Sequence, residues 1–257
     1  MSIASEQMQQ LLDCLDVFCQ IFDMHVNLDP HKTCCVVFRK AGVPVPAAFR
    51  PGGGRALLFR GQPIAIKPGY TYLGLWLDET RSMASSADIL SEKGRNAMHA
   101  LLPRLRQHFI SQFDMRCRLF DILVEPVLSY GAQIWGPLML NKWLFKRGGT
   151  ACLADSLHHH FLCTTAGMAP KGKDRDMVLR EFHRMSLPCR WALLAASWWE
   201  KLKAMHATRL VRQAWLADVD LMLRGCQDCW TYHFLSALQR LEVIDPQAWQ
   251  PGLVGVT

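Results

Sequence analysis

Two cysteines and a histidine near the end of the chain, Cys226, Cys229 and His233, stand at the spacing with which many zinc sites begin. Structural zinc usually takes four thiolate or imidazole ligands. No fourth Cys or His follows in the sequence, and apolar residues continue through the segment at helical spacing: Trp230, Phe234, Leu238 and Leu241. We therefore expect a buried helix face there, and no metal site or cofactor in this chain.

Histidines 158–160 lie inside another apolar helical pattern. Successive residues of a helix point in different directions, so three consecutive histidines cannot converge on one metal ion. Four tryptophans are more typical of helix packing than of a surface on which bases stack: Trp191, Trp198, Trp199 and Trp215. We expect both groups to pack helices together.

Positive charge is concentrated in the middle and the C-terminal half of a chain whose formal net charge is +7. Residues 93–147 hold nine Lys and Arg against three acids, and residues 171–212 hold ten against four. This density suits nucleic acid, which is bound largely through its phosphates. A solvated basic surface fits the same counts, so composition leaves both interpretations open.

The hydrophobic pattern predicts one helix from Met8 to Phe22, then a small β element. Short strands are expected at 34–38, 57–59, 62–66 and 70–77, with a tight turn at Arg60 and Gly61. Helical patterns follow at 87–109, bent near Pro103, and at 120–130, and they fill the chain from 151 onward with breaks at 167–172, 187–188 and Gly225.

Neither a membrane span nor a secretory signal is visible, because the apolar runs are far shorter than the roughly 20 residues of a spanning helix and the N-terminus is polar. The ten cysteines are spread along the chain without a secretion signal, which favours reduced thiols. We expect an intracellular protein, in the nucleus or the cytoplasm, with no membrane partner.

Three segments together resemble the reverse transcriptases of non-LTR (LINE-type) retrotransposons, over roughly residues 5–136. The first helix with Asn27, a short spacer and Lys32 before a strand is similar to the segment after that family's catalytic Tyr-x-Asp-Asp hairpin. Residues 70–78 resemble its Tyr-Leu-Gly strand. Residues 123–135, a leucine-rich helix running into Tyr-Gly-x-x-x-Trp, are similar to its thumb signature.

The resemblance implies nucleic-acid contacts for Asn27 and for a primer grip formed by Tyr72, Leu73 and Gly74. Gly74 would let a nucleic-acid backbone come close, whereas an ordinary strand would pack Tyr72 and Leu73 into the core. For Lys32 the resemblance implies a general acid that protonates the pyrophosphate leaving group in an intact enzyme. Taken alone, Asn27 and Lys32 are equally typical of a helix end and a solvated turn.

The departure from the family concerns its metal centre. Polymerisation requires paired carboxylates that hold Mg²⁺, and this chain contains no Asp-Asp dipeptide. The resemblance therefore predicts a truncated C-terminal portion of the family enzyme, without polymerase activity alone. Whether the chain takes part in enzymatic turnover stays open at this point.

We expect an α+β fold with a palm remnant at 1–80, which is one helix and a small antiparallel sheet with a primer-grip-like hairpin. A helical thumb-like region at 81–147 and a helical C-terminal region at 148–257 would follow. The expected function is binding of RNA or RNA/DNA primer-template by a basic surface. Two alternatives are the thumb side of an active RNA-directed DNA polymerase whose catalytic half is encoded upstream, and a domesticated RNA-binding or scaffold protein.

Overall fold

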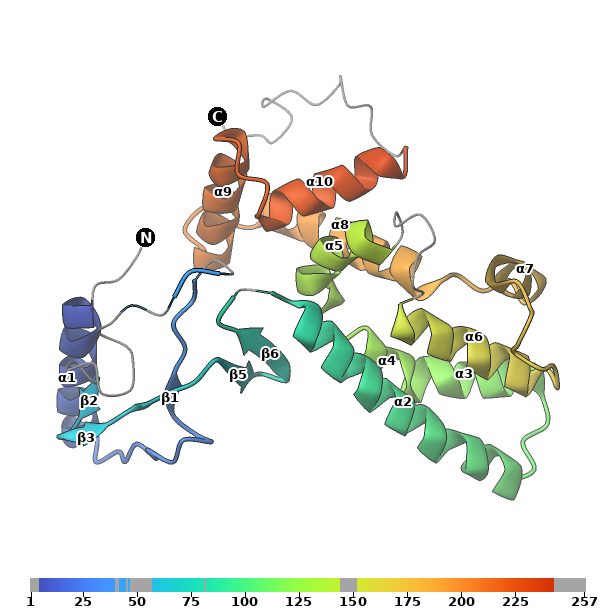
Figure 1. Ribbon diagram of the computed structural model, residues 1–257, viewed down its shortest axis with the longest axis horizontal. Helices are drawn as coiled ribbons and strands as arrows, with labels where there is room; N and C mark the ends of the chain where they lie inside the picture. Colours follow the sequence, from blue (N-terminus) through green and yellow to red (C-terminus); the bar gives the residue numbers. More distant parts are fainter. Residues whose placement is uncertain are drawn as a thin grey trace. The chain divides into compact units, whose positions relative to one another are not determined.

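The chain consists of two units, Met1–Ser85 and Ser86–Thr257, in the computed structural model shown in Figure 1. The structure describes residues 5–39, 42–44, 46, 57–80, 82–143 and 152–242. Within these ranges, no helix has both the length and the apolar character needed to cross a bilayer. The fold class is α+β and mostly helical, as the sequence predicts.

The first unit holds one helix and six short strands. They are α1 (Ser5–Ile21), β1 (Cys34–Cys35), β2 (Leu58–Phe59), β3 (Gln62–Pro63), β4 (Ala65–Ile66), β5 (Gly69–Tyr72) and β6 (Leu75–Asp78). The strands form separate pairs, of which β2–β3 and β5–β6 are antiparallel and β1–β4 is parallel. The parallel pair was not expected.

Two strand predictions were wrong in their extent. The strand expected at 34–38 has only two residues, Cys34 and Cys35. The strand expected at 70–77 is instead a hairpin that reverses at Leu73 and Gly74, whose φ angles are 46° and 86°. Positive φ at both central residues gives the turn type whose twist matches that of the flanking strands. The turn predicted at Arg60 and Gly61 is confirmed, with φ angles of 51° and 73°.

The small core of the first unit forms where α1 meets the β2–β3 hairpin. Cys19, Phe59 and Ile64 are buried there. The amide side chain of Gln9 donates to Leu58 O at 2.8 Å and accepts from Leu58 N at 2.9 Å, so it takes the place of a neighbouring strand on β2. This pairing satisfies an edge that would otherwise present open backbone groups.

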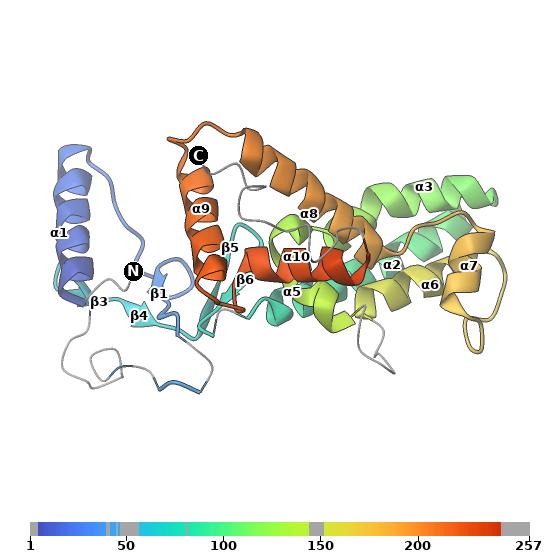
Figure 2. The ribbon, with the colours of Figure 1, turned by 90° about the horizontal axis from the view of Figure 1, so that it is seen from above.

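The second unit is helical throughout its described length. Its helices are α2 (Ala84–Gln107), α3 (Phe113–Leu123), α4 (Glu125–Leu128), α5 (Ala132–Trp143), α6 (Leu153–Thr165), α7 (Arg175–Glu181), α8 (Leu187–Ala204), α9 (Leu210–Leu223) and α10 (Trp230–Arg240). The pattern at 120–130 is divided between α3 and α4 at Val124. Helices α5, α8, α9 and α10 pack together, and α3, α4 and α6 lie beside α2 (Figures 1 and 2).

Large aromatic side chains form the core between α5 and α8. Trp135 and Trp191 are fully buried and meet edge to face, with ring centroids 4.9 Å apart. Their indole N–H groups donate to Tyr130 O and to Ser129 Oγ, both at 2.8 Å. Because both polar groups are bonded, the burial of the two rings carries no unpaired donor.

Gly94 brings α2 close to α4. A Cβ at this position would lie 2.1 Å from Leu128 Cδ2 and 2.6 Å from Leu128 Cγ. Such a distance is a steric overlap, so even the smallest side chain would displace Leu128 from a fully buried site. Glycine is therefore retained inside a helix despite its cost to helix stability.

We predict that Gly94→Ala lowers the free energy of unfolding by about 1–3 kcal/mol through this overlap, although the change favours an isolated helix. Chemical denaturation measures the effect. Adding Leu128→Ala makes room for the new methyl group, so the double variant should lose less stability than the sum of the two single variants. Strict additivity would contradict the close contact.

Helix α1 presents an apolar face that the described residues do not cover. Leu11, Leu15, Phe18 and Phe22 are 56, 42, 48 and 61 % exposed. Phe18 and Phe22 contact each other, with ring centroids 4.5 Å apart. Contiguous exposed apolar surface of this kind promotes association. The adjacent flank of the helix contributes Cys19 and the half-buried Leu12 to the core.

We predict that α1 exchanges its amide hydrogens faster than α5 and α8, because fewer buried side chains hold it. Leu15→Gln should leave stability within about 0.5 kcal/mol and reduce self-association, while Leu12→Gln on the core side should cost more than about 1 kcal/mol. Hydrogen exchange with light scattering makes the comparison. Equal protection of α1 and α8 in a monomeric sample would contradict it.

Candidate nucleic-acid interface

The segment with Asn27 and Lys32 is a tight polar loop. Asp29 N donates to Asn27 Oδ1 at 2.9 Å, and Thr33 Oγ1 donates to Asn27 O at 2.7 Å. Lys32 N and Thr33 N both donate to Asp29 O. Asn27 thus organises the loop with both its side chain and its carbonyl group, as asparagine does in many turns. The Lys32 side chain is exposed.

The residues expected to form a primer grip lie at the end of the β5–β6 hairpin. Tyr72 is 58 % exposed and Leu73 is 73 % exposed, so the expectation that a strand packs them into the core is wrong. Leu73 keeps a positive φ that costs a non-glycine residue on the order of 1 kcal/mol. The neighbouring Gly74 supplies the second positive φ of the turn without such a cost.

One hydrogen bond joins these two segments. The Tyr70 hydroxyl donates to Lys32 O at 3.1 Å, and Tyr70 belongs to the same strand as Tyr72. The structure therefore brings the loop of Asn27 and Lys32 beside the hairpin of Tyr72, Leu73 and Gly74. Tyr70 and Tyr72 occupy alternate positions of β5 and differ in exposure, since Tyr70 is half-buried and Tyr72 is exposed.

Carboxylates occupy the open end of the hairpin, away from its tip. Asp78 pairs with Gly69 in the ladder. Its pKa is lowered, chiefly because the Thr80 hydroxyl donates to it at 2.5 Å, and Thr80 N donates at 2.8 Å. Glu79 forms an ion pair with Arg39. Negative charge at this end leaves the tip as the part of the hairpin that a polyanion can approach.

Several of the arginines counted in the sequence serve internal contacts in the second unit. Arg175, Arg184 and Arg190 form ion pairs with Asp155, Asp121 and Glu125 respectively. The Arg212 guanidinium donates to Leu202 O, Lys203 O and Met205 O at the end of α8, where carbonyl groups lack helical partners. Charge counting alone could not separate these from cations available to a ligand.

Exposed cations remain on α2 and α3. Lys93 and Arg104 lie about three turns apart on one side of α2, and Arg106 ends the same helix. Arg118 is exposed on α3. In the described parts of the chain, none of these four forms an ion pair. Among the described residues of the middle region, these four are exposed cations without a carboxylate partner.

The side chains of histidines 158–160 differ in burial, because consecutive residues of a helix point in different directions. His158 is buried, His159 is half-buried and His160 is exposed. Burial lowers the pKa of His158 to about 4, with the positive charge of Arg184 as the next cause. Its ring stacks on Phe120 with centroids 5.3 Å apart. The three imidazole rings therefore share no site. In the other candidate group, Cys229 directly precedes α10, and its thiol donates to Cys226 O.

The sequence predicts no metal ligands in histidines 158–160 or in the group of Cys226, Cys229 and His233. Over the described ranges, no group of three His, Cys, Asp or Glu side chains is placed to hold an ion. The Mg²⁺ that the family resemblance implies therefore has no ligand set among the described residues. Lys32 has the exposure that a phosphate contact requires, and its role as an acid stays a prediction.

We predict that the buried neutral His158 makes stability depend on pH. Its pKa falls from 6.5 in the unfolded chain to about 4 in the fold, so the unfolded state binds more protons between these values. Stability should fall by roughly 3 kcal/mol as the pH drops from 6.5 to 4. His158→Leu should remove this contribution, and His160→Leu should not. Denaturation curves over this pH range, compared as differences from the wild type, decide the matter.

The comparisons with known proteins add no family to this geometry. No protein-family model, no curated protein and no solved structure matches the chain.

Proposed function

We propose that this chain is a reverse-transcriptase-like protein of the non-LTR type that binds RNA or an RNA/DNA primer-template and does not catalyse polymerisation by itself. The hydrogen bond from Tyr70 to Lys32 O carries the proposal, because it joins the loop with the exposed Lys32 to the hairpin whose tip exposes Tyr72. The absence of an Asp-Asp dipeptide from the sequence supports the non-catalytic part.

The exposed groups suit the two parts of a nucleotide. The Tyr72 ring offers a face on which a base can stack, a contact worth about 1–3 kcal/mol per base. The Lys32 ammonium offers a point charge for a phosphate. Gly74 has no Cβ, so a sugar-phosphate backbone can approach the turn closely. Exposed cations on α2 add sequence-independent attraction.

We predict weak binding with little sequence preference and a strong dependence on salt. The logarithm of the affinity should fall linearly with the logarithm of salt concentration, by about 0.7 per neutralised phosphate on a single strand. Fluorescence anisotropy with labelled RNA and RNA/DNA duplex measures this slope. Binding that is absent, or independent of salt, would contradict the proposal.

Two variants separate stacking from charge. Tyr72→Ala should weaken binding about tenfold or more without changing the salt slope, because it removes a stacking face and no charge. Lys32→Gln should reduce the slope by about one phosphate contact. Lys67→Gln is the matched control, since Lys67 is a half-buried lysine of the same unit outside the hairpin tip. An equal loss with the control would assign the effect to net charge alone.

A second candidate function is favoured by the exposed apolar face of α1. We propose, as the alternative, that this face contacts a separate polymerase half that supplies the aspartates. Leu11, Leu15, Phe18 and Phe22 would then be buried in the complex. The two proposals share the nucleic-acid contacts and differ in whether a protein partner is required for polymerisation.

A further inference from the structure

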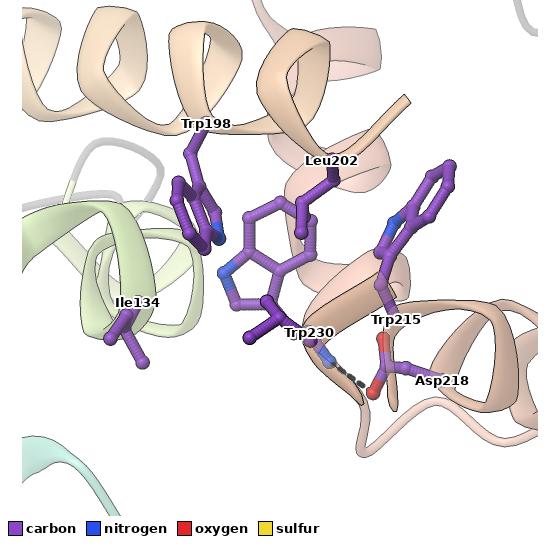
Figure 3. A pocket seen from close by; sticks show the side chains of 7 residues that line it. Ile134, Trp198, Leu202, Trp215, Asp218 and Trp230 are labelled. Atoms are coloured by element: carbon purple, nitrogen blue, oxygen red, sulfur yellow. Dashed lines mark hydrogen bonds between the residues drawn. The ribbon is translucent and has the colours of Figure 1, made fainter. Parts of the chain in front are cut away.

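The second unit contains a small cavity lined by three indole rings and one carboxylate. Its volume is about 220 Å³, and its walls are Ile134 of α5, Trp198 and Leu202 of α8, Val211, Trp215 and Asp218 of α9, and Trp230 of α10. Figure 3 shows the indoles of Trp198 and Trp230 and the side chain of Leu202 around the space, with Asp218 beside Trp215. This volume is below that of a pocket for a drug-sized ligand.

The indole rings are held in place from behind. Trp199, which does not line the cavity, meets Trp215 edge to face at 5.0 Å and stacks on Trp230 at 6.1 Å. The Trp230 indole N–H donates to Gln133 O at 3.1 Å. Trp215 is almost fully buried. The cavity is therefore bounded by rings whose orientation is set by packing before any ligand arrives, which lowers the entropic cost of binding.

Hydrogen bonds also hold the Asp218 carboxylate in place. Asp218 accepts hydrogen bonds from Trp230 N at 3.3 Å and from Thr231 N at 2.8 Å, so it caps the start of α10 from the neighbouring helix (Figure 3). A carboxylate has more acceptor sites than these two bonds use. Its negative charge consequently remains on the wall of an otherwise apolar cavity.

We propose that this cavity binds a trimethylammonium group, which is the chemistry shared by choline-type cations and trimethyllysine. Indole faces attract a weakly hydrated cation through their negative π surfaces, and the carboxylate adds Coulomb attraction. Among the described residues that line the cavity, an anion would meet the Asp218 carboxylate and no Lys or Arg. A neutral apolar ligand would bury the carboxylate against hydrocarbon, at a cost in free energy.

The test uses the whole chain, with tetramethylammonium, choline, trimethyllysine and lysine as probes at constant ionic strength. Indole N–H signals in NMR spectra report the site, because the chain has nine tryptophans and three of the described ones line the cavity. We expect the signals of Trp198, Trp215 and Trp230 to shift with the trimethylated probes and not with lysine. A preference for choline over trimethyllysine would assign the site to a free cation, and the reverse preference to a modified lysine.

The neutral isostere 3,3-dimethyl-1-butanol distinguishes a cation site from an apolar cavity without any mutation. It has the shape of choline and no charge, and it should bind at least about tenfold more weakly. Equal binding of the two, shifts confined to other tryptophans, or no shift with any quaternary ammonium would overturn the proposal.

Variants test the carboxylate and the indole rings of the cavity separately. Asp218→Asn keeps a side-chain acceptor for the start of α10 and removes the charge, so affinity for choline should fall about tenfold while the fold is retained. Asp220→Asn is the matched control, because Asp220 is exposed on α9 and pairs with Arg224. Trp198→Leu should weaken choline binding and leave 3,3-dimethyl-1-butanol little affected. Equal effects of the two Asn variants would contradict a role for the Asp218 carboxylate.

Discussion

Three arginine–carboxylate pairs constrain the second unit, because each joins segments that are far apart in the sequence. Arg190 joins α8 to Glu125 of α4, and Arg175 joins α7 to Asp155 of α6. Arg184, between α7 and α8, pairs with Asp121 of α3. Asp155 is buried, and this burial raises its pKa although Arg175 opposes the shift. Removing one partner of such a pair leaves an uncompensated charge, which costs more than the pair contributes.

The same pairs determine which cations a ligand can meet. Arg175, Arg184 and Arg190 are engaged by carboxylates, so fewer cations are free to contact a phosphate than the count of Lys and Arg suggests. The exposed cations of the second unit include those of α2 and α3 together with Lys171, Lys173, Arg180, Lys201 and Arg209, and the first unit exposes Lys32. The proposed binding of nucleic acid would combine phosphate neutralisation with stacking and would carry little sequence information.

Two carboxylates, those of Asp218 and Asp174, cap helices, and the cap by Asp218 helps to position one wall of the tryptophan cavity. Asp218 lies near the middle of α9 and caps α10, which fixes where Trp230 stands. Asp174 caps α7 by accepting from Met177 N at 2.9 Å. The acceptor role of both carboxylates arises because the first N–H groups of a helix have no partner within the helix.

The sequence by itself determined the α+β class, the position of α1, the turn at Arg60 and Gly61, and the long helix around Pro103, because local periodicity and turn chemistry encode them. It misjudged residues 70–77, since a hairpin that reverses at Leu73 and Gly74 lacks a strong turn sequence. Only the tertiary structure decided that Tyr70 bonds Lys32 O, and that Trp198, Trp215 and Trp230 surround one cavity with Asp218. These residues are far apart in sequence and belong to different elements, so no local pattern records that they meet.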